Sequence, residues 1–377
     1  MTRRPIVLAL FVALLLTGLV PATVGAETRL PLPDTMAAVG DSITQAASSA
    51  GSLGSDAPQN SWATGTSTTV NSHYLRLLAL GAPISGQNHN RSVSGAKVGG
   101  LAAQMQDAAT FQPDYLTVLI GGNDLCADTV AEMTSVTDFR AQFDAAMAAL
   151  DTASPSTNVY VVSIPDAYQL WSLFKNNFWA RFIWSSADIC QSLLANPGST
   201  QQVDVDRRAA FRQRNIDYNV QLQQECAEHA RCRFDGNAAF NTPLTTGDVS
   251  GDYFHPSVQG QAKLASVSWA AGYAWDATMT VGQLTSSTSV ARNSWSATVT
   301  VLVVNEGGSP VSGAGVSTTW TVGASDTCTT ATDGRCSVTS DGFNKKKVSS
   351  VTLTVAGVTH AVLTYEPSLT TIAVARP

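Results

Sequence analysis

The pattern of hydrophobic residues changes near Trp275, and this change limits the folds that the chain can adopt. From about residue 35 to residue 274, short apolar runs alternate with amphipathic stretches of helical length. Such alternation is typical of a layered α/β domain with parallel strands. After Trp275, threonine, serine, valine and glycine dominate, and apolar residues recur at every second position. The sequence therefore predicts two domains of different classes.

Strands and helices of the first region can be placed from these patterns. Three short apolar runs are expected to be buried strands, at residues 36–39, 115–120 and 159–163. Three other stretches have the period of an amphipathic helix, at residues 101–109, 139–150 and 207–230. Strands that are joined by helices of this length run parallel to one another. We therefore expect a parallel sheet that is covered by helices.

The second region reads as about 100 residues of short strands. Alternating runs occur at residues 296–303 and 348–355, and glycine-containing turns such as Asp333-Gly334 separate them. This spacing predicts an antiparallel β-sandwich of immunoglobulin type. Cys328 and Cys336 flank the Asp333-Gly334 turn, and we expect a disulfide between them.

The first 26 residues are predicted to be a secretory signal peptide. Arg3 and Arg4 precede an apolar run, and small residues follow it up to Ala26. A retained anchor is the alternative, but the uninterrupted run is shorter than the ~20 residues of a spanning helix. No later segment is apolar enough to span a bilayer. The expected organisation is a signal peptide (1–26), an α/β domain (34–275) and a β-sandwich domain (277–377), in a secreted, extracellular protein.

The chain contains six cysteines, an even number that favours disulfides in an oxidising compartment. They are Cys126, Cys190, Cys226, Cys232, Cys328 and Cys336. Pairing in sequence order needs one long loop and two short ones, although other pairings are possible. A zinc site at Cys226, His229 and Cys232 is the alternative. It lacks a fourth ligand at a suitable spacing, so we expect no metal.

Composition excludes two classes of protein. Hydrophobic residues make up 44% of the chain, which is too many for a disordered protein. The net charge is −6, whereas a nucleic-acid binder needs a basic face. We therefore expect a globular protein that does not bind nucleic acid.

Candidate catalytic residues follow the predicted strands. Ser42, in Gly40-Asp41-Ser42, comes directly after the first strand, and ligand sites of open α/β sheets lie beyond the carboxyl ends of strands. Asn123 follows the next strand, where its amide can stabilise an oxyanion, although an ordinary turn would also place it there. Gly95 lies in a polar loop, and its amide can approach an oxyanion closely, although a turn alone would also explain this glycine.

A histidine and a carboxylate complete the candidate set. Asp252 and His255 are three residues apart, so a turn can bring the carboxylate to the imidazole and fix its tautomer. The other ring nitrogen can then face a serine. Of the five histidines, only His255 has this upstream acid together with a proline-capped helix downstream. His73, by contrast, is expected to be a packed or solvated helix residue.

Together these residues resemble a known family, the SGNH hydrolases or GDSL-type esterases and lipases. The resemblance rests on four blocks in order: Gly40-Asp41-Ser42-Ile43, Ser94-Gly95-Ala96, Gly121-Gly122-Asn123-Asp124 and Asp252-Tyr253-Phe254-His255-Pro256. The block that ends at Cys126 is similar to that of phospholipase B-like members, and the whole chain resembles exported actinobacterial GDSL proteins. The Gly-x-Ser-x-Gly elbow of the α/β-hydrolases is absent.

The resemblance implies a fold and a set of roles. The fold would be a three-layer α/β/α sandwich with a flavodoxin-like parallel sheet. Ser42 would be the nucleophile, His255 the general base and Asp252 its orienting partner, while Ser42, Gly95 and Asn123 would form the oxyanion hole. No cofactor is needed, because the acyl-enzyme mechanism uses only these groups.

The substrate stays open at this stage. The family implies a lipid or other acyl ester, and the aromatic segment 168–184 is either an exposed acyl-binding wall or lid, or a packed core helix. A carbohydrate esterase that removes acetyl groups from polysaccharides is the alternative enzyme. A surface-binding or spacer protein with an inactive hydrolase domain is the alternative of another class. In either case the C-terminal domain could contact a cell wall or a glycan.

Overall fold

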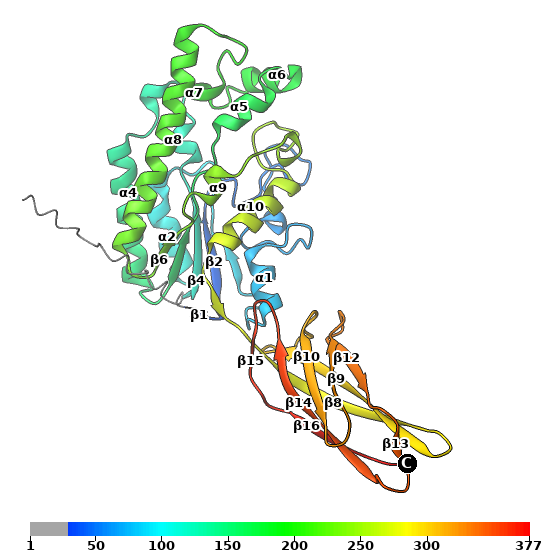
Figure 1. Ribbon diagram of the computed structural model, residues 1–377. Helices are drawn as coiled ribbons and strands as arrows, with labels where there is room; N and C mark the ends of the chain where they lie inside the picture. The colour runs from blue at the N-terminus through cyan, green and yellow to red at the C-terminus, as the bar shows by residue number, and fades with distance from the viewer. Residues whose placement is uncertain (1–28) are drawn as a thin grey trace, which may run out of the picture.

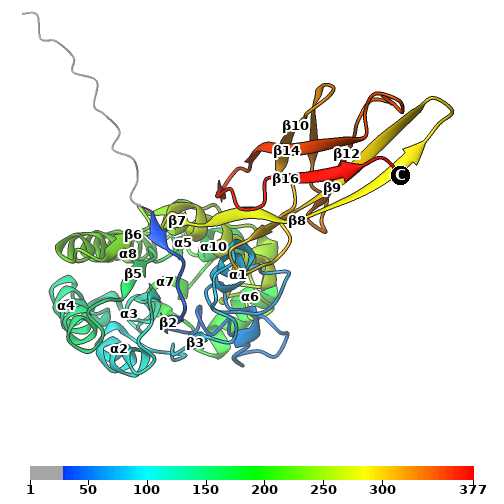
Figure 2. The same cartoon turned by 90° about the horizontal axis from the view of Figure 1, so that it is seen from below.

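The computed structural model describes residues 29–377, in which an α/β region is followed by an elongated β region (Figure 1). The predicted signal peptide, residues 1–26, lies outside the described residues. No helix in the described part is long and apolar enough to cross a membrane. Seen from below, the β region projects to one side of the α/β region (Figure 2).

A parallel sheet forms the centre of the α/β region. Its five strands in the described chain lie in the order β3 (Asn88–Asn90), β2 (Met36–Gly40), β4 (Tyr115–Leu119), β5 (Asn158–Val161) and β6 (Cys232–Phe234). All four neighbouring pairs are parallel. Counted along the chain, this is the flavodoxin-like order 2-1-3-4-5. The strand order reverses between β2 and β4, which is where ligands bind in such sheets.

Helices cover both faces of this sheet. One face packs against α2 (Leu101–Ala109), α4 (Val136–Ala153) and α8 (Gln202–Glu228). The other face packs against α1 (His73–Leu80) and α10 (Val258–Ala271). Within β2, Ala37 and Val39 face the first group while Met36 and Ala38 face the second, so every residue of this strand is buried. The predicted three-layer α/β/α sandwich is confirmed.

Shorter elements follow the carboxyl ends of the strands. They are α3 (Gly122–Leu125), α5 (Tyr168–Phe174), α6 (Phe178–Ser186), α7 (Gln191–Leu194) and α9 (Ala238–Asn241). Short 3-10 helices lie at Pro58–Asn60, Val98–Gly100, Val130–Glu132 and Thr246–Asp248. The three predicted strands are present as β2, β4 and β5. Strands β3 and β6 are not among the predicted strands, because these edge strands have three residues each and no apolar run.

The C-terminal region is a β-sandwich. One sheet contains β11 (Ser325–Thr329), β10 (Gly315–Trp320), β14 (Ser350–Thr359) and β16 (Thr371–Ala375). The other contains β12 (Arg335–Thr339), β9 (Ser294–Asn305), β8 (Thr278–Val290) and β15 (Thr364–Tyr365), and β13 (Phe343–Asn344) pairs with β9. All strand pairs are antiparallel except β8 with β15. Alternate residues of β9 are buried in the core between the sheets, which agrees with the predicted period of two.

Two short strands and a side-chain contact join the regions. β1 (Leu30–Pro31) pairs in parallel with β7 (Trp275–Asp276), directly before β8. The side chain of Asn305, at the end of β9, donates a hydrogen bond to the carbonyl of Ala79 in α1 (3.2 Å). The change of pattern near Trp275 therefore coincides with the change from the parallel sheet to the β-sandwich.

His73 is completely buried in the core at the start of α1. Its Nδ1 lies 2.8 Å from the Tyr115 hydroxyl, and its Nε2 lies 2.8 Å from Ser268 Oγ. Ser268 already donates its proton to the carbonyl of Leu264 (2.6 Å), so Nε2 carries the ring hydrogen and Nδ1 accepts from Tyr115. Burial lowers the pKa of His73 from 6.5 to about 3. His73 is therefore a neutral core residue.

Acid is expected to destabilise the fold through His73. Between the two pKa values the unfolded chain binds a proton that the folded protein does not, so the free energy of unfolding falls as pH falls from 6.5 toward 3. This contribution is at most about 1.4 kcal/mol per pH unit. In urea unfolding across this window, the free energy of unfolding should depend more steeply on pH for the unsubstituted protein than for His73→Gln. Parallel curves for the two proteins would contradict this assignment.

Candidate active site

Ser42 is placed by the tight turn that ends β2. Gly40 has a φ of +144°, and a Cβ there would lie 2.1 Å from the carbonyl oxygen of Leu119 in β4. Only glycine fits this close approach of the backbones. The chain turns at this point, and Ser42 comes to the carboxyl edge of the sheet between β2 and β4.

His255 comes from a loop that is closed by its own hydrogen bonds. Val249 and Pro256 form an antiparallel bridge, and the backbone N–H of Ser250 donates to the carbonyl of His255 (2.8 Å). Ser257 then caps α10 by accepting a hydrogen bond from the N–H of Gly260 (3.2 Å). These local contacts fix the backbone on which Asp252 and His255 are carried.

Ser42, His255 and Asp252 are in direct contact. Ser42 Oγ lies 2.9 Å from His255 Nε2, and His255 Nδ1 lies 2.7 Å from Asp252 Oδ2. An ionised carboxylate can only accept, so Nδ1 carries the proton and Nε2 accepts the hydrogen bond of the serine hydroxyl. The structure thus brings together three of the predicted residues in the order that nucleophile activation requires.

Asp252 is held in the ionised form. Burial acts to raise its pKa, but hydrogen bonds from His255 and from the hydroxyl of Ser48 outweigh this effect, and the pKa lies below its ordinary value. Ser48 donates to Asp252 Oδ2 (2.6 Å), and the backbone N–H groups of Phe254 and His255 donate to Oδ1 (both 3.0 Å). Ser48 is not among the predicted site residues, because it is 204 residues away from Asp252 along the chain.

Asn123 lies in the wall of the same pocket as Ser42. It is in the first turn of α3, and its Nδ2 donates to the carbonyl of Ala96 (3.0 Å). Next to it, the buried Asp124 accepts hydrogen bonds from the N–H of Val98 (2.9 Å) and the hydroxyl of Thr134 (2.8 Å). These bonds attach the loop that contains Gly95 to α3. Gly95 itself is exposed, has a φ of +80°, and is not among the pocket residues.

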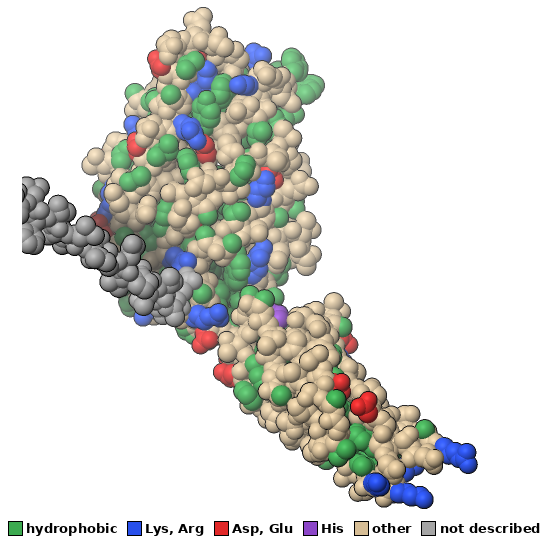
Figure 3. All heavy atoms as spheres, in the orientation of Figure 1, with side chains coloured by type: hydrophobic (Ala, Val, Ile, Leu, Met, Phe, Trp, Pro, Cys, Tyr) green, Lys and Arg blue, Asp and Glu red, His purple; other side chains and the backbone are tan. Residues whose placement is uncertain are grey.

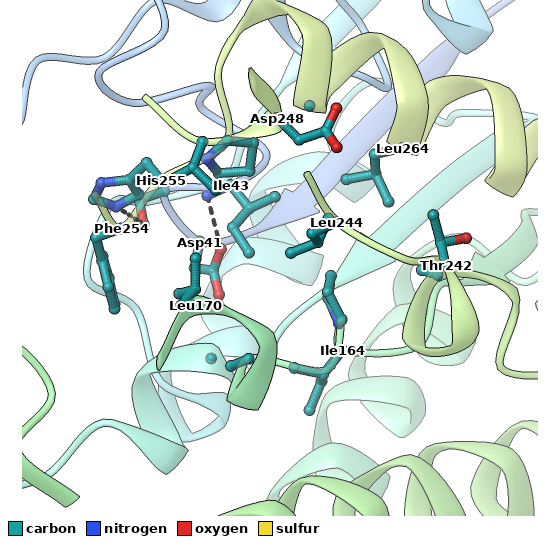
Figure 4. A pocket seen from close by; sticks show the side chains of 18 of the residues that line it. Asp41, Ile43, Ile164, Leu170, Thr242, Leu244, Asp248, Phe254, His255 and Leu264 are labelled. Carbon is teal, nitrogen blue, oxygen red and sulfur yellow. Dashed lines mark hydrogen bonds between the residues drawn. The ribbon is translucent and has the colours of Figure 1, made fainter. Parts of the chain in front are cut away.

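An apolar pocket opens beside Ser42. Its volume is about 110 Å³, and Figure 4 shows the side chains around it. The apolar part of the wall is formed mainly by Ile43, Ile164, Leu170, Leu244, Phe254 and Leu264. Lys263 and Asp248, which form an ion pair, and Asp41 are also in the wall. The wall of the pocket is therefore mostly apolar.

The aromatic segment 168–184 is divided between the core and the surface. Leu170 of α5 lines the pocket, while Phe174 of α5 and Trp184 of α6 are buried against the loop that carries His255. Other aromatic side chains of α6 are exposed. Each of the two interpretations of this segment therefore fits a part of it.

Three disulfides are present in the described chain, and they pair the cysteines in sequence order. They are Cys126–Cys190, Cys226–Cys232 and Cys328–Cys336. The first joins the end of α3, beside the pocket, to the start of α7. The third links β11 to β12, which belong to different sheets of the β-sandwich. Because Cys226 and Cys232 are bonded to each other, they provide no thiolates for zinc.

One cluster in the described residues has the donor types of a metal site, but its contacts are those of ion pairs. Asp144, Glu225 and His229 have ligand atoms close together. Arg140 forms ion pairs with Glu225 and Glu228, and His229 contacts both Glu225 and Asp151. A guanidinium in this position opposes a second cation, so the cluster is a poor fit for a metal ion.

Comparison with known proteins identifies the family. The model of the GDSL-like Lipase/Acylhydrolase family matches residues 38–263, more than half of the chain. A GDSL-like lipase from Parabacteroides merdae is 19% identical, with 65% of this chain and 98% of that chain covered and a TM-score of 0.39. The Clostridium thermocellum family 3 carbohydrate esterase is 16% identical, with 63% and 93% covered and a TM-score of 0.38. No curated protein sequence matches the chain.

The family match defines the class of protein as an ester-hydrolysing enzyme, and the flavodoxin-like fold agrees with it. The chain belongs to the GDSL-like lipase/acylhydrolase family.

Asp41, between Gly40 and Ser42, lines the pocket but is not among the predicted site residues. Its carboxyl group is buried in the pocket wall, and Oδ1 accepts the N–H of Ile43 (2.9 Å). Burial raises its pKa from 3.8 to about 7. In the sequence, the only indication that Asp41 belongs to the site is its position directly after a buried apolar strand.

Asp41 gives stability a pH dependence of opposite sign to that of His73. Between pH 3.8 and about 7 the folded state keeps a proton that the unfolded state has released, so this group lowers the free energy of unfolding as pH rises. As pH rises through this window, the free energy of unfolding of the unsubstituted protein should fall relative to that of Asp41→Asn by up to about 1.4 kcal/mol per pH unit. Urea unfolding of both proteins at several pH values measures this difference in free energy. A difference between the two proteins that does not change with pH would contradict the raised pKa.

Proposed function

We propose that the protein is a secreted serine esterase that hydrolyses lipid or other acyl esters with apolar chains. The observation that carries the proposal is the 2.9 Å contact between Ser42 Oγ and His255 Nε2 at the edge of an apolar pocket. A lone serine–histidine contact would fit many roles. Its place at the point where the strand order reverses, with an ionised Asp252 behind the imidazole, favours nucleophilic catalysis.

The proposed reaction has two halves. His255 Nε2 takes the proton of Ser42 as Oγ bonds to the ester carbonyl carbon, and the carbonyl oxygen becomes an oxyanion. The Ser42 and Gly95 amides and the Asn123 side chain are the proposed donors to this oxygen. The C–O bond to the alcohol then breaks as His255 returns the proton to the leaving oxygen. Water attacks the acyl-enzyme by the same steps, which releases the carboxylic acid and restores Ser42.

The shape of the pocket supports an apolar acyl chain. Once Ser42 holds the carbonyl carbon, the chain attached to it can extend between Ile43, Leu244 and Leu264. Each methylene moved from water into such a wall contributes about 0.8 kcal/mol, or roughly fourfold in kcat/KM. An acetyl group would leave most of this wall without a contact.

Export and domain organisation are parts of the same proposal. We place a signal peptide at residues 1–26, the hydrolase domain at 34–275 and an immunoglobulin-like β-sandwich at 277–377. The three disulfides of the described chain support an oxidising compartment. Strand β8 begins directly after the proposed boundary.

Loss of the nucleophile should abolish turnover. Ser42→Ala is expected to lower kcat for a p-nitrophenyl ester by on the order of 10⁴-fold or more, and His255→Ala similarly, because the two groups act as a unit. Asn123→Ala is expected to lower kcat about 10²–10³-fold, because one hydrogen-bond donor to the oxyanion is removed. Thermal unfolding of each variant shows whether it is folded. Near-normal turnover by folded Ser42→Ala would overturn the proposal.

Filling the pocket should shorten the preferred acyl chain. Leu244 is half-buried in a loop of the pocket wall, so Leu244→Trp is expected to fill the cavity with little disturbance of the core. We expect the ratio of kcat/KM for octanoyl to acetyl p-nitrophenyl ester to fall at least about tenfold, as expected for the loss of several buried methylenes.

Leu244→Met is the matched control for this substitution, because it keeps the volume and apolar character of the side chain. It should retain the chain-length preference. A strict preference of the unsubstituted protein for acetyl esters would contradict a lipid substrate, and release of acetate from acetylated xylan would then favour the carbohydrate esterase.

A further inference from the structure

The outer side of α6 exposes three aromatic side chains next to one another. The exposed fractions are 71% for Phe178, 61% for Trp179 and 56% for Phe182. Their rings contact each other, with centroids 5.3 Å apart for Phe178 and Trp179 and 6.3 Å apart for Trp179 and Phe182. Figure 3 shows hydrophobic side chains protruding from the surface in the region where Figure 1 has α6. We call these three residues the aromatic face.

The opposite side of α6 is anchored to the active site. Trp184 is completely buried, and its indole Nε1 donates a hydrogen bond to the carbonyl of Tyr253 (3.1 Å). The ring of Phe174 in α5 packs edge-on against the Tyr253 ring, with centroids 5.2 Å apart. Tyr253 lies between Asp252 and His255 in the chain. The aromatic face is therefore held on the outside of the loop that carries the catalytic imidazole.

The segment that carries the aromatic face has two cations, Lys175 and Arg181, between the acids Asp166 and Asp188. Asp166 is already paired with Arg212. The whole chain, by contrast, has a net charge of −6. Aromatic side chains flanked by cations are the composition of segments that lie in the interface of anionic membranes.

The size of the face favours a lipid surface over a protein partner. A buried aromatic side chain covers about 150–250 Å², so the exposed parts of three amount to roughly 400 Å². A stable protein interface needs about 800 Å² on each partner. Insertion into a lipid headgroup region has no such minimum, because each ring enters independently and the cations pair with phosphates.

We infer that the aromatic face docks the enzyme on anionic lipid surfaces and so brings the pocket of Ser42 to esters held in those surfaces. The second part of this inference, the delivery of esters to the pocket, rests on the proposed hydrolysis of lipid esters. Docking itself is independent of turnover, since Phe178, Trp179 and Phe182 are outside the pocket wall.

Vesicle sedimentation tests the docking directly. The experiment uses the full chain with Ser42→Ala, so that hydrolysis does not alter the lipid, and vesicles of phosphatidylcholine alone or mixed equally with phosphatidylglycerol. The test variant combines Phe178→Ser, Trp179→Ser and Phe182→Ser. The matched control combines Val203→Ser, Val205→Ser and Val220→Ser, which removes three exposed apolar side chains from α8.

The parent protein should bind the mixed vesicles more tightly than phosphatidylcholine alone. The test variant with three substitutions in α6 (the α6 variant) should lose at least about tenfold in affinity for the mixed vesicles. The control with three substitutions in α8 (the α8 variant) should keep the affinity of the parent protein. Arg181→Gln should weaken binding to the mixed vesicles only. No binding by the parent, or equal binding by the α6 variant, would overturn the inference. So would a concentration-dependent dimer that the α6 substitutions abolish, since a second copy would then cover the face.

A second readout separates this inference from the proposed function. With Ser42 intact, the α6 variant should hydrolyse a soluble p-nitrophenyl acetate at the unsubstituted rate, while its rate on an ester embedded in mixed vesicles should fall. An equal fall in the hydrolysis rates of the soluble and the embedded ester would contradict a docking role. If no ester is hydrolysed by any variant, the proposed function fails, whereas the vesicle-binding result still decides the docking.

Discussion

The contact between Ser42 and His255 is the interaction on which the account of this enzyme depends. It joins two turns that are 213 residues apart along the chain. One turn is fixed by the close approach of Gly40 to β4, and the other by the hydrogen bonds that close the loop between Val249 and Pro256. The distance between the hydroxyl and the imidazole therefore depends on the position of both turns. The parallel sheet matters here mainly because it holds the first of these turns in place.

Much of the fold could be predicted because its signals are local. Strands β2 and β4 are buried on both faces, so they appear in the sequence as short continuous apolar runs. The alternation along β9 similarly indicates a sandwich strand with one buried face. Strands β3 and β6 have no such signal, since they are short, half-buried edges that depend on their neighbours for pairing.

In the candidate site, too, some features could be predicted from the sequence and others could not. Asp252 and His255 share one turn, so their three-residue spacing predicts their contact, which the structure contains. Ser48 shares no such turn with Asp252, and nothing in a loop of small polar residues indicates that its hydroxyl reaches that carboxylate. Asp41 could be seen in the sequence, but its raised pKa results from burial by distant parts of the chain. Sequence spacing therefore reveals partners within a turn, and tertiary packing determines the rest.

Covalent labelling tests the central assignment most directly. An alkyl fluorophosphonate reacts with a serine whose hydroxyl is activated by a histidine and whose surroundings stabilise a developing oxyanion. After incubation of the full chain with an octyl fluorophosphonate, peptide mass spectrometry should locate one adduct, on Ser42, and folded His255→Gln should remain unlabelled over the same time. An adduct on a different serine, or no adduct on a folded protein that hydrolyses esters, would contradict the account.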